Sequence, residues 1–315
     1  MAEKLTAQQR AMLFGAATRQ HFQMLGMQEC TGGAQTLSFR VPKARILQGV
    51  RLMVEGKFTV EGETYQPRTL DVYRVLRRLS IDFNNGFTPV VASGEEIALN
   101  NMLYPNPEII VPDADGKTLA TCPAEWTAGE HDFSFVLDVP LTINYRDPVG
   151  LVLAQNQETS IDIICDIANG ADMVHNKTGV TLSLGNVKIT PMCITYSIPS
   201  DARAFPDMSV LKILDSRNEV FTAGQSYIKL ATGMIYRKLI LKFEDSEGDV
   251  LSPEDITSNI ELILNTADIP YSISPKMLRA TDLMQSGIAY PDGCYYFSFD
   301  FQGINGYGGL TEKVA

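Results

Sequence analysis

Three histidines, His21, His131 and His175, are the first candidates for acid–base chemistry, because imidazole changes charge near neutral pH. His131 adjoins Asp132, but successive residues of a strand point to opposite faces, so these two cannot form a relay. The sequence contains no GxSxG elbow, no HExxH and no cysteine pairs at zinc spacing. We therefore predict no catalytic residue, and a surface or structural role for His131.

Two short motifs resemble ligand-binding loops but fit other roles better. Asp113-Ala-Asp115-Gly116 begins like a calcium loop, yet the third acidic position and the distal glutamate are missing, so we expect a turn. The glycine-rich stretch 303–309 has the wrong spacing for a dinucleotide loop and follows a predicted strand, so we expect a flexible connection. The sequence thus predicts no metal site and no cofactor.

Five cysteines are spread along the chain, an odd number without any CxxC motif. We expect buried free thiols rather than disulfides or a metal site. They are Cys30, Cys122, Cys165, Cys193 and Cys294. Residues 1–20 contain no apolar core of a secretory signal, so we expect synthesis in a reducing cytoplasm. The sequon Asn176-Lys177-Thr178 is then expected to stay unmodified.

The composition is that of an ordinary globular protein with an acidic surface. The 315 residues are 45% hydrophobic and 20% charged, with a net charge of −11. This balance argues against direct binding of nucleic acid, which requires a surplus of Lys and Arg. No run of 18 apolar residues occurs, so the sequence predicts no membrane-spanning segment.

Hydrophobic periodicity predicts one helix followed by strands. In residues 5–27 apolar side chains recur every three or four positions, which is typical of an amphipathic helix. Such an arm either packs on its own domain or docks on a neighbouring subunit or a membrane surface. Turn-separated β-rich runs follow. The predicted strands are 36–41, 49–56, 77–83, 133–141, 159–167, 187–199, 210–215, 226–231, 236–243, 260–265 and 295–301.

Two sequence matches in the same order suggest an internal duplication. LRRLSIDF at 76–83 aligns with YRKLILKF at 236–243, an offset of 237 − 77 = 160. Phe-Ser-Phe at 133–135 returns at 297–299, an offset of 297 − 133 = 164. We therefore predict an all-β chain of two similar sandwiches. Its parts are an N-terminal helical arm (1–32), a first sandwich (33–200) and a second sandwich (206–315).

Several longer phrases resemble the double jelly-roll major capsid proteins of tailless bacteriophages with an internal membrane, the tectivirus-like group of the PRD1–adenovirus lineage. The resemblance extends over most of the chain from about residue 14. The phrases are RRLSIDFNNGFTPVVASGEEI (77–97), DPVGLVLAQNQETSIDI (147–163), TYSIP (195–199), FTAGQSYIKLATG (221–233) and PDGCYYFSFDFQGINGYGG (291–309).

This resemblance implies a structural protein without enzymatic activity or cofactor. It implies a homotrimer that forms a pseudo-hexagonal capsomer and assembles with neighbouring capsomers and minor vertex proteins into an icosahedral virion. It also implies a helical arm on the inner side, towards the internal membrane or neighbouring capsomers. Two other interpretations stay open: a carbohydrate-binding or adhesion protein with an aromatic platform or calcium site, and a two-sandwich hydrolase with convergent carboxylates.

The second half departs from the resemblance at one point. After the first Phe-Ser-Phe, at 133–135, the sequence predicts two more long strands, at 159–167 and 187–198. After the second Phe-Ser-Phe, at 297–299, only residues 300–315 remain. In a jelly roll the last two strands lie inside the sheets, so their loss would leave backbone edges unpaired. We expect that the natural chain continues beyond residue 315 or that separate segments complete the second sandwich.

Overall fold

The computed structural model divides the chain into two compact units, and each is described by itself. Unit 1 comprises Met1–Ser216 and unit 2 comprises Arg217–Ala315. The structure describes residues 7–84, 86–103, 110–143, 149–155, 158–175, 179–206, 208–222, 224, 227–264, 268–287, 289–299 and 310–311. The glycine-rich stretch 303–309 and the sequon 176–178 lie outside these residues.

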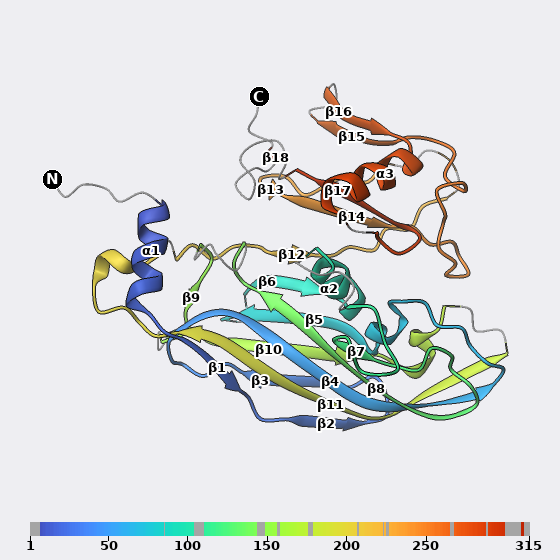
Figure 1. Ribbon diagram of the computed structural model, residues 1–315, viewed down its shortest axis with the longest axis horizontal. Helices are drawn as coiled ribbons and strands as arrows, with labels where there is room; N and C mark the ends of the chain where they lie inside the picture. Colours follow the sequence, from blue (N-terminus) through green and yellow to red (C-terminus); the bar gives the residue numbers. More distant parts are fainter. Residues whose placement is uncertain are drawn as a thin grey trace. The chain divides into compact units, whose positions relative to one another are not determined.

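Unit 1 consists of two facing β-sheets with short helices at their ends (Figure 1). Its helices are α1 (Ala7–Ala17) and α2 (Gly94–Asn101), with 3-10 turns η1 (Asp71–Val75), η3 (Gly170–Met173) and η4 (Ala202–Ala204). Its strands are β1 (Gln20–Met24), β2 (Gln28–Thr31), β3 (Thr36–Arg40), β4 (Ile46–Gly62), β5 (Leu76–Phe83), β6 (Phe87–Ala92), β7 (Ala120–Thr121), β8 (Gly129–Pro140), β9 (Val152–Leu153), β10 (Ile161–Ile167), β11 (Val180–Tyr196) and β12 (Leu214–Asp215).

The strand order is that of a jelly roll. One sheet runs β1-β11-β4-β8-β7, with β2 also paired to β11 and β9 to β4; the other runs β12-β6-β5-β10-β3. The last long strands, β10 and β11, lie between strands formed earlier in the chain: β10 between β5 and β3, β11 between β1 and β4. This interior placement of the last two strands, expected from the sequence, is confirmed for unit 1.

Strict alternation of side chains builds the core between the sheets. On β8, Phe133, Phe135, Leu137 and Val139 point inward and are at most 3% exposed, while the residues between them stay partly accessible. The rings of Phe133 and Phe135 stack with centroids 6.1 Å apart. Burial of such side chains supplies most of the stability of a sandwich, about 2 kcal/mol for each large apolar group.

The N-terminal segment corrects the sequence prediction. The helix ends at Ala17, and the predicted helix over residues 18–27 is wrong, because residues 20–24 form β1. The Thr18 hydroxyl donates to the Phe14 carbonyl at 2.7 Å at the end of the helix. From Gln20 the chain pairs with β11, and that ladder provides the backbone hydrogen bonds that a longer helix would have made.

Helix α1 is anchored on its own unit by one side chain. Phe14 is 5% exposed and packs edge to face on Tyr196, with ring centroids 5.1 Å apart. Met12 and Leu13 remain 67% and 41% exposed. Because Phe14 is the one buried residue among those of α1 whose burial is described, the predicted amphipathic stripe is not confirmed.

Within the residues of unit 2 that the structure describes, the strands are shorter and are arranged in three two-stranded sheets. The pairs are β13 with β18, β14 with β17, and β15 with β16 (Figure 1). Their bounds are β13 (Ile235–Tyr236), β14 (Lys238–Lys242), β15 (Ile260–Leu264), β16 (Asp268–Ile273), β17 (Cys294–Ser298) and β18 (Leu310–Thr311), and helix α3 spans Pro275–Ser286. The strand predicted at 226–231 is not formed over its described residues 227–231, and that predicted at 210–215 is reduced to β12.

The duplication is present, but one of the two matches that suggested it aligns the wrong strands. Residues 76–83 form β5, which pairs with β6 and β10, whereas 236–243 contain β14, which pairs with β17. The partner of β17 should correspond to the partner of β8, namely β4. The ladder register sets Gly56 opposite Phe133 and Leu239 opposite Phe297, so the true offset on this strand is 239 − 56 = 183.

Candidate functional site

The three histidines lie apart in the structure and form no common site. His21 is half-buried on β1, and His131 is a partly accessible residue of β8 whose Nε2 lies 2.6 Å from the Thr127 carbonyl. His175 is 8% exposed and follows η3. The predicted surface or structural role of His131 therefore fits its surroundings, while His175 has a network of its own.

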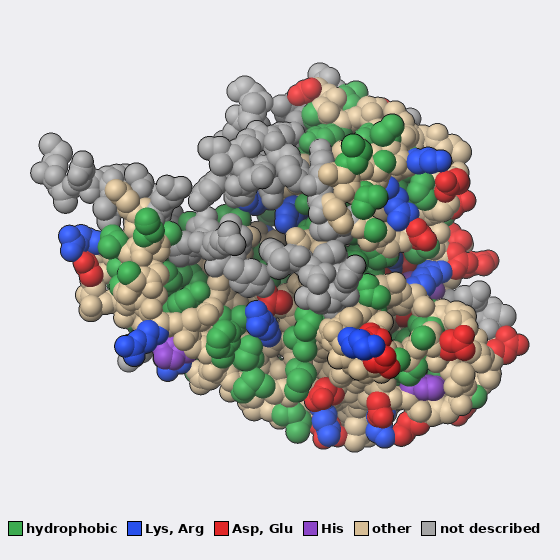
Figure 2. Space-filling model, viewed as in Figure 1, with side chains coloured by type: hydrophobic (Ala, Val, Ile, Leu, Met, Phe, Trp, Pro, Cys, Tyr) green, Lys and Arg blue, Asp and Glu red, His purple; other side chains and the backbone are tan. Residues whose placement is uncertain are grey.

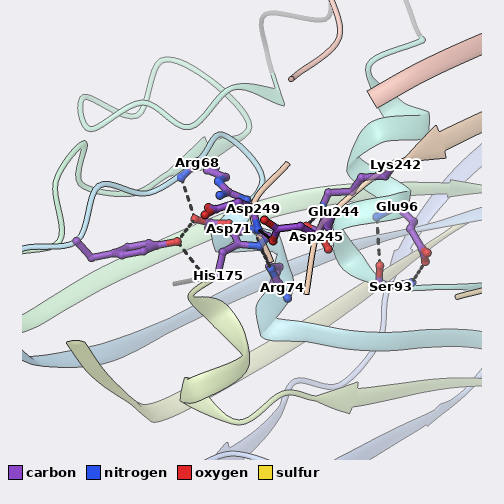
Figure 3. Close-up of polar contacts among 11 residues, drawn as sticks. Arg68, Asp71, Arg74, Ser93, Glu96, His175, Lys242, Glu244, Asp245 and Asp249 are labelled. Carbon is purple, nitrogen blue, oxygen red and sulfur yellow. Dashed lines mark hydrogen bonds and ion pairs between the residues drawn. The ribbon is translucent and has the colours of Figure 1, made fainter. Parts of the chain in front are cut away.

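His175 belongs to a buried polar cluster that the sequence did not reveal. Its Nε2 lies 2.6 Å from Oδ1 of Asp71, the first residue of η1, and its Nδ1 lies 2.6 Å from a terminal nitrogen of Arg74 (Figure 3). The same Arg74 nitrogen lies 2.8 Å from Nε2, so it is close to both ring nitrogens of His175. Asp71 Oδ2 accepts from the Tyr65 hydroxyl at 2.7 Å and from the Arg68 amide at 2.8 Å.

The cluster connects separate segments of unit 1 through buried hydrogen bonds. Asp71 is fully buried, and the Tyr65 hydroxyl, whose pKa burial raises, also accepts from the His175 amide at 3.2 Å. These bonds tie η1 to the segment between η3 and β11. Sequence reasoning had no signal for the cluster, because its members lie up to 175 − 65 = 110 residues apart.

The single tryptophan supports no carbohydrate platform. Trp126 is fully buried and packs on Phe58 and Tyr65, with ring centroids 4.7 and 5.3 Å apart. A sugar-binding platform needs an exposed aromatic face. Trp126 is therefore a core residue of unit 1.

Asp113 and Asp115 lie in a turn, as the sequence predicted. The Gly116 amide donates to the Asp113 carbonyl, and the Lys117 amide donates to Asp113 Oδ2 at 3.0 Å. Lys117 Nζ pairs with Asp115 at 2.7 Å. Within the described ranges, no three His, Cys, Asp or Glu side chains lie close enough together to hold a metal ion.

The five cysteines are buried, which confirms their expected location. Burial raises the pKa of Cys122 and Cys165 to about 12 and that of Cys193 to about 11. These thiols stay protonated at neutral pH and are poor nucleophiles.

The most unusual surface of unit 1 lies at its N-terminal edge. Of the three outward-facing residues of β1, Gln20, Phe22 and Met24, two are hydrophobic, while His21 and Gln23 are half-buried. This is the reverse of the usual alternation on an edge strand. Phe22 and Met24 of β1, Met27 and the helix residues Met12 and Leu13 are each at least 41% exposed, and we name these five hydrophobic side chains of the N-terminal segment the N-terminal apolar surface.

Charged pairs cover other parts of the same sheet. Arg51 of β4 pairs with Asp138 of β8 at 2.6 Å, and Lys57 pairs with Glu130 at 2.6 Å. Burial raises the pKa of Asp138, and the Arg51 guanidinium opposes that shift. The space-filling view shows hydrophobic side chains grouped on this face, with charged side chains in pairs beside them (Figure 2).

Comparison with known proteins identifies the fold. No protein-family model matches the sequence, and no curated protein matches it. Among solved structures, the STIV MCP, from Sulfolobus Turreted Icosahedral Virus, superposes on 94% of this chain and 89% of its own, with a TM-score of 0.61 and 14% identity. This chain has a double jelly-roll fold.

Two further solved structures give the same result. The major capsid protein of Bacteriophage PM2 matches 94% of the chain and 88% of its own, with 10% identity and a TM-score of 0.51. The structure of the PBCV-1 virus capsid matches 94% of this chain and 81% of its own, with 10% identity and a TM-score of 0.53. The architecture of the double jelly roll, predicted from the sequence, is therefore confirmed. None of the described helices has the length and apolar character needed to cross a bilayer.

Proposed function

We propose that this chain is the major capsid protein of an icosahedral virus and has a structural, non-enzymatic role. The observation that carries the proposal is the likeness of fold over 94% of the chain to the STIV MCP. Capsid proteins from Sulfolobus Turreted Icosahedral Virus and Bacteriophage PM2 have this arrangement in common despite 10–14% identity to the chain. The protein would then be located in the virion after synthesis in the host cytoplasm.

The proposed assembly unit is a homotrimer. Three chains with two similar jelly rolls each give six comparable wedges, which is what a capsomer of sixfold shape requires. Neighbouring capsomers, minor vertex proteins and an internal membrane near helix α1 complete the set of proposed partners. The net charge of −11 fits a shell that does not bind nucleic acid directly.

Mass and shape measurements test this assembly. A trimer of the 34.7 kDa chain has a mass of 3 × 34.7 = 104.1 kDa, which light scattering after size exclusion distinguishes from a monomer. Electron microscopy of the purified protein should show pseudo-hexagonal particles or closed shells. A monomer at every concentration and salt condition would contradict the proposal.

The N-terminal apolar surface is expected to contribute to the contact between copies. Replacing Phe22 and Met24 with serine removes two hydrophobic side chains that are more than half exposed. The Phe22→Ser/Met24→Ser protein should fold as before but associate at least tenfold more weakly in sedimentation velocity. The matched control, Lys57→Ser/Asp132→Ser, changes two accessible residues of β4 and β8 in the same sheet and should assemble normally. Equal assembly of both variants would exclude this surface from the interface.

A further inference from the structure

Unit 2 repeats the middle of unit 1 strand for strand. The ladder of β4 with β8 corresponds to that of β14 with β17, and the ladder of β5 with β6 corresponds to that of β15 with β16. Helix α2 lies between β6 and β8 in the chain, as α3 lies between β16 and β17, and each helix has a serine N-cap, Ser93 or Ser274. Phe297 and Phe299 stack 6.5 Å apart, as Phe133 and Phe135 do in unit 1.

Unit 1 adds one more strand to each of these ladders. β11 pairs with β4 on the edge opposite β8, and β10 pairs with β5 on the edge opposite β6. In the part of unit 2 that the structure describes, β14 with β17 and β15 with β16 each form a sheet of two strands. The positions held by β11 and β10 in unit 1 thus have no counterpart strand among those residues.

The side chains next to these positions are more exposed in unit 2 than in unit 1. By register, Leu241 lies opposite Tyr295 as Phe58 lies opposite His131. Phe58 is fully buried, whereas Leu241 is only half-buried. On β15, the counterpart of β5, Ile263 is 38% exposed.

The core of unit 2 shows the same deficit. Five buried side chains form its centre, and hydrophobic side chains that remain partly exposed surround them: Leu230, Tyr236, Leu239, Leu241, Phe243, Ile256, Ile260, Tyr271 and Ile273. Partly covered hydrophobic side chains around a small core indicate that a layer of apolar cover is missing.

We infer that β14 and β15 bind two further strands, supplied by an extended polypeptide segment with alternating apolar side chains. One strand runs antiparallel to β14, as β11 does to β4, and the other runs antiparallel to β15, as β10 does to β5. Backbone hydrogen bonds to β14 and β15 provide the affinity, as in other cases of strand addition. The apolar positions of the added strands determine their register.

Fusion of a donor segment to the full chain tests this inference. A second copy of residues 159–198, which contains β10 and β11, is joined behind Ala315 through a flexible Gly/Ser linker, so that binding becomes intramolecular. Hydrogen exchange of the amides at 238–242 and 260–264 should slow at least tenfold relative to the unfused chain. The control fusion carries proline in place of Ile163 and Ile189 of the added copy, and should give no protection because proline breaks the ladder.

Three results would overturn the inference. In the first, amides of β14 and β15 in the unfused chain already exchange as slowly as those of β4 and β5. In the second, the intact fusion leaves their exchange unchanged. In the third, protection rises with protein concentration alone, which would mean that a second copy covers the edges. The assay needs neither a trimer nor a shell, so its outcome is independent of the proposed capsid function.

Discussion

At the scale of residues, two buried carboxylates lie in opposite surroundings. Asp71 in unit 1 accepts hydrogen bonds from Tyr65 and the Arg68 amide and faces His175. Asp282 in unit 2 is 6% exposed and accepts a longer bond, 3.3 Å, from the Tyr296 amide. Burial raises the pKa of Asp282 to about 6, with the Tyr296 amide and the Arg279 charge opposing the shift. Removal of the two charges should therefore have opposite effects.

Asp71→Ala is expected to destabilise unit 1. The substitution leaves the Tyr65 hydroxyl, the Arg68 amide and His175 without their acceptor in the core, at a cost of about 3 kcal/mol. Urea unfolding followed by fluorescence of Trp126, the single tryptophan, reports on this unit. The exposed Asp115→Ala should change the free energy by less than about 0.5 kcal/mol. Similar losses in both variants would show that the cluster contributes no stability.

Asp282→Asn is expected to stabilise unit 2 above pH 6. Because the folded pKa, about 6, exceeds the ordinary value of 3.8, the native state binds more protons, and stability rises as pH falls through this window. Asparagine is uncharged and retains an acceptor for the Tyr296 amide. Hydrogen exchange of β17 at pH 7.5 should show a gain of about 2 kcal/mol that vanishes near pH 4. A gain that is the same at both pH values would contradict the titration.

The residues that carry chemistry were predictable only in part. The turn at Asp113 and the burial of the cysteines followed from local sequence, because turn residues and apolar neighbours act over a few positions. The cluster around Asp71 did not, since it depends on tertiary contacts between segments far apart in the chain. Its residues are scattered along the chain and match no motif, so no local pattern predicts the cluster.

At the scale of elements, the long strands of unit 1 were predicted with few errors. Runs of β-branched and aromatic residues located β3, β5, β8 and β10 to within a few residues, although β4 and β11 are much longer than expected. The error at β1 came from apolar residues spaced so that they fit a helix and a strand alike. Residues 20–24 form a strand because they pair with β11. Phe22 lies opposite Ile194, 194 − 22 = 172 residues away, and a local sequence pattern cannot predict such a distant partner.

Helix α2 offers a direct test of local stabilisation. Ser93 and Glu96 form a reciprocal capping box: the Glu96 amide donates to Ser93 Oγ at 3.3 Å, and Glu96 Oε2 accepts from the Ser93 amide at 2.6 Å. Ser93→Ala should lower the free energy of unfolding of unit 1 by about 1 kcal/mol, measured by Trp126 fluorescence in urea. Ser93→Asp retains a cap acceptor and should lose much less. Equal losses for both would mean that the serine matters for another reason.

At the scale of the whole molecule, the duplication could be predicted but its alignment could not. Phe-Ser-Phe marks equivalent strands in both units, with both phenylalanines directed into the core. LRRLSIDF and YRKLILKF match because any two basic, alternating strands look alike, although they occupy different positions in the jelly roll. Strand order depends on which edges pair, and composition carries no information about that.

The net charge also affects how copies associate. With −11 on each chain, association of like-charged subunits is opposed at low ionic strength. The proposed trimer should therefore form more readily in 0.5 M than in 0.02 M salt, as sedimentation velocity would show. A trimer that is favoured by low salt would instead indicate an interface dominated by complementary charges.

The interior position of β10 and β11 has a consequence for synthesis on the ribosome. Until residue 161 has left the exit tunnel, each sheet of unit 1 lacks a strand in its middle, and β1 has no neighbour until residues 192–196 follow. At 5–20 residues per second, translation of 161–196 alone takes roughly 2 to 7 s. Some 160 residues of strand-forming sequence therefore remain incompletely paired and prone to aggregation until β10 and β11 are synthesised. Both sheets can then be completed within a few seconds. Chaperone dependence should be greatest in this interval.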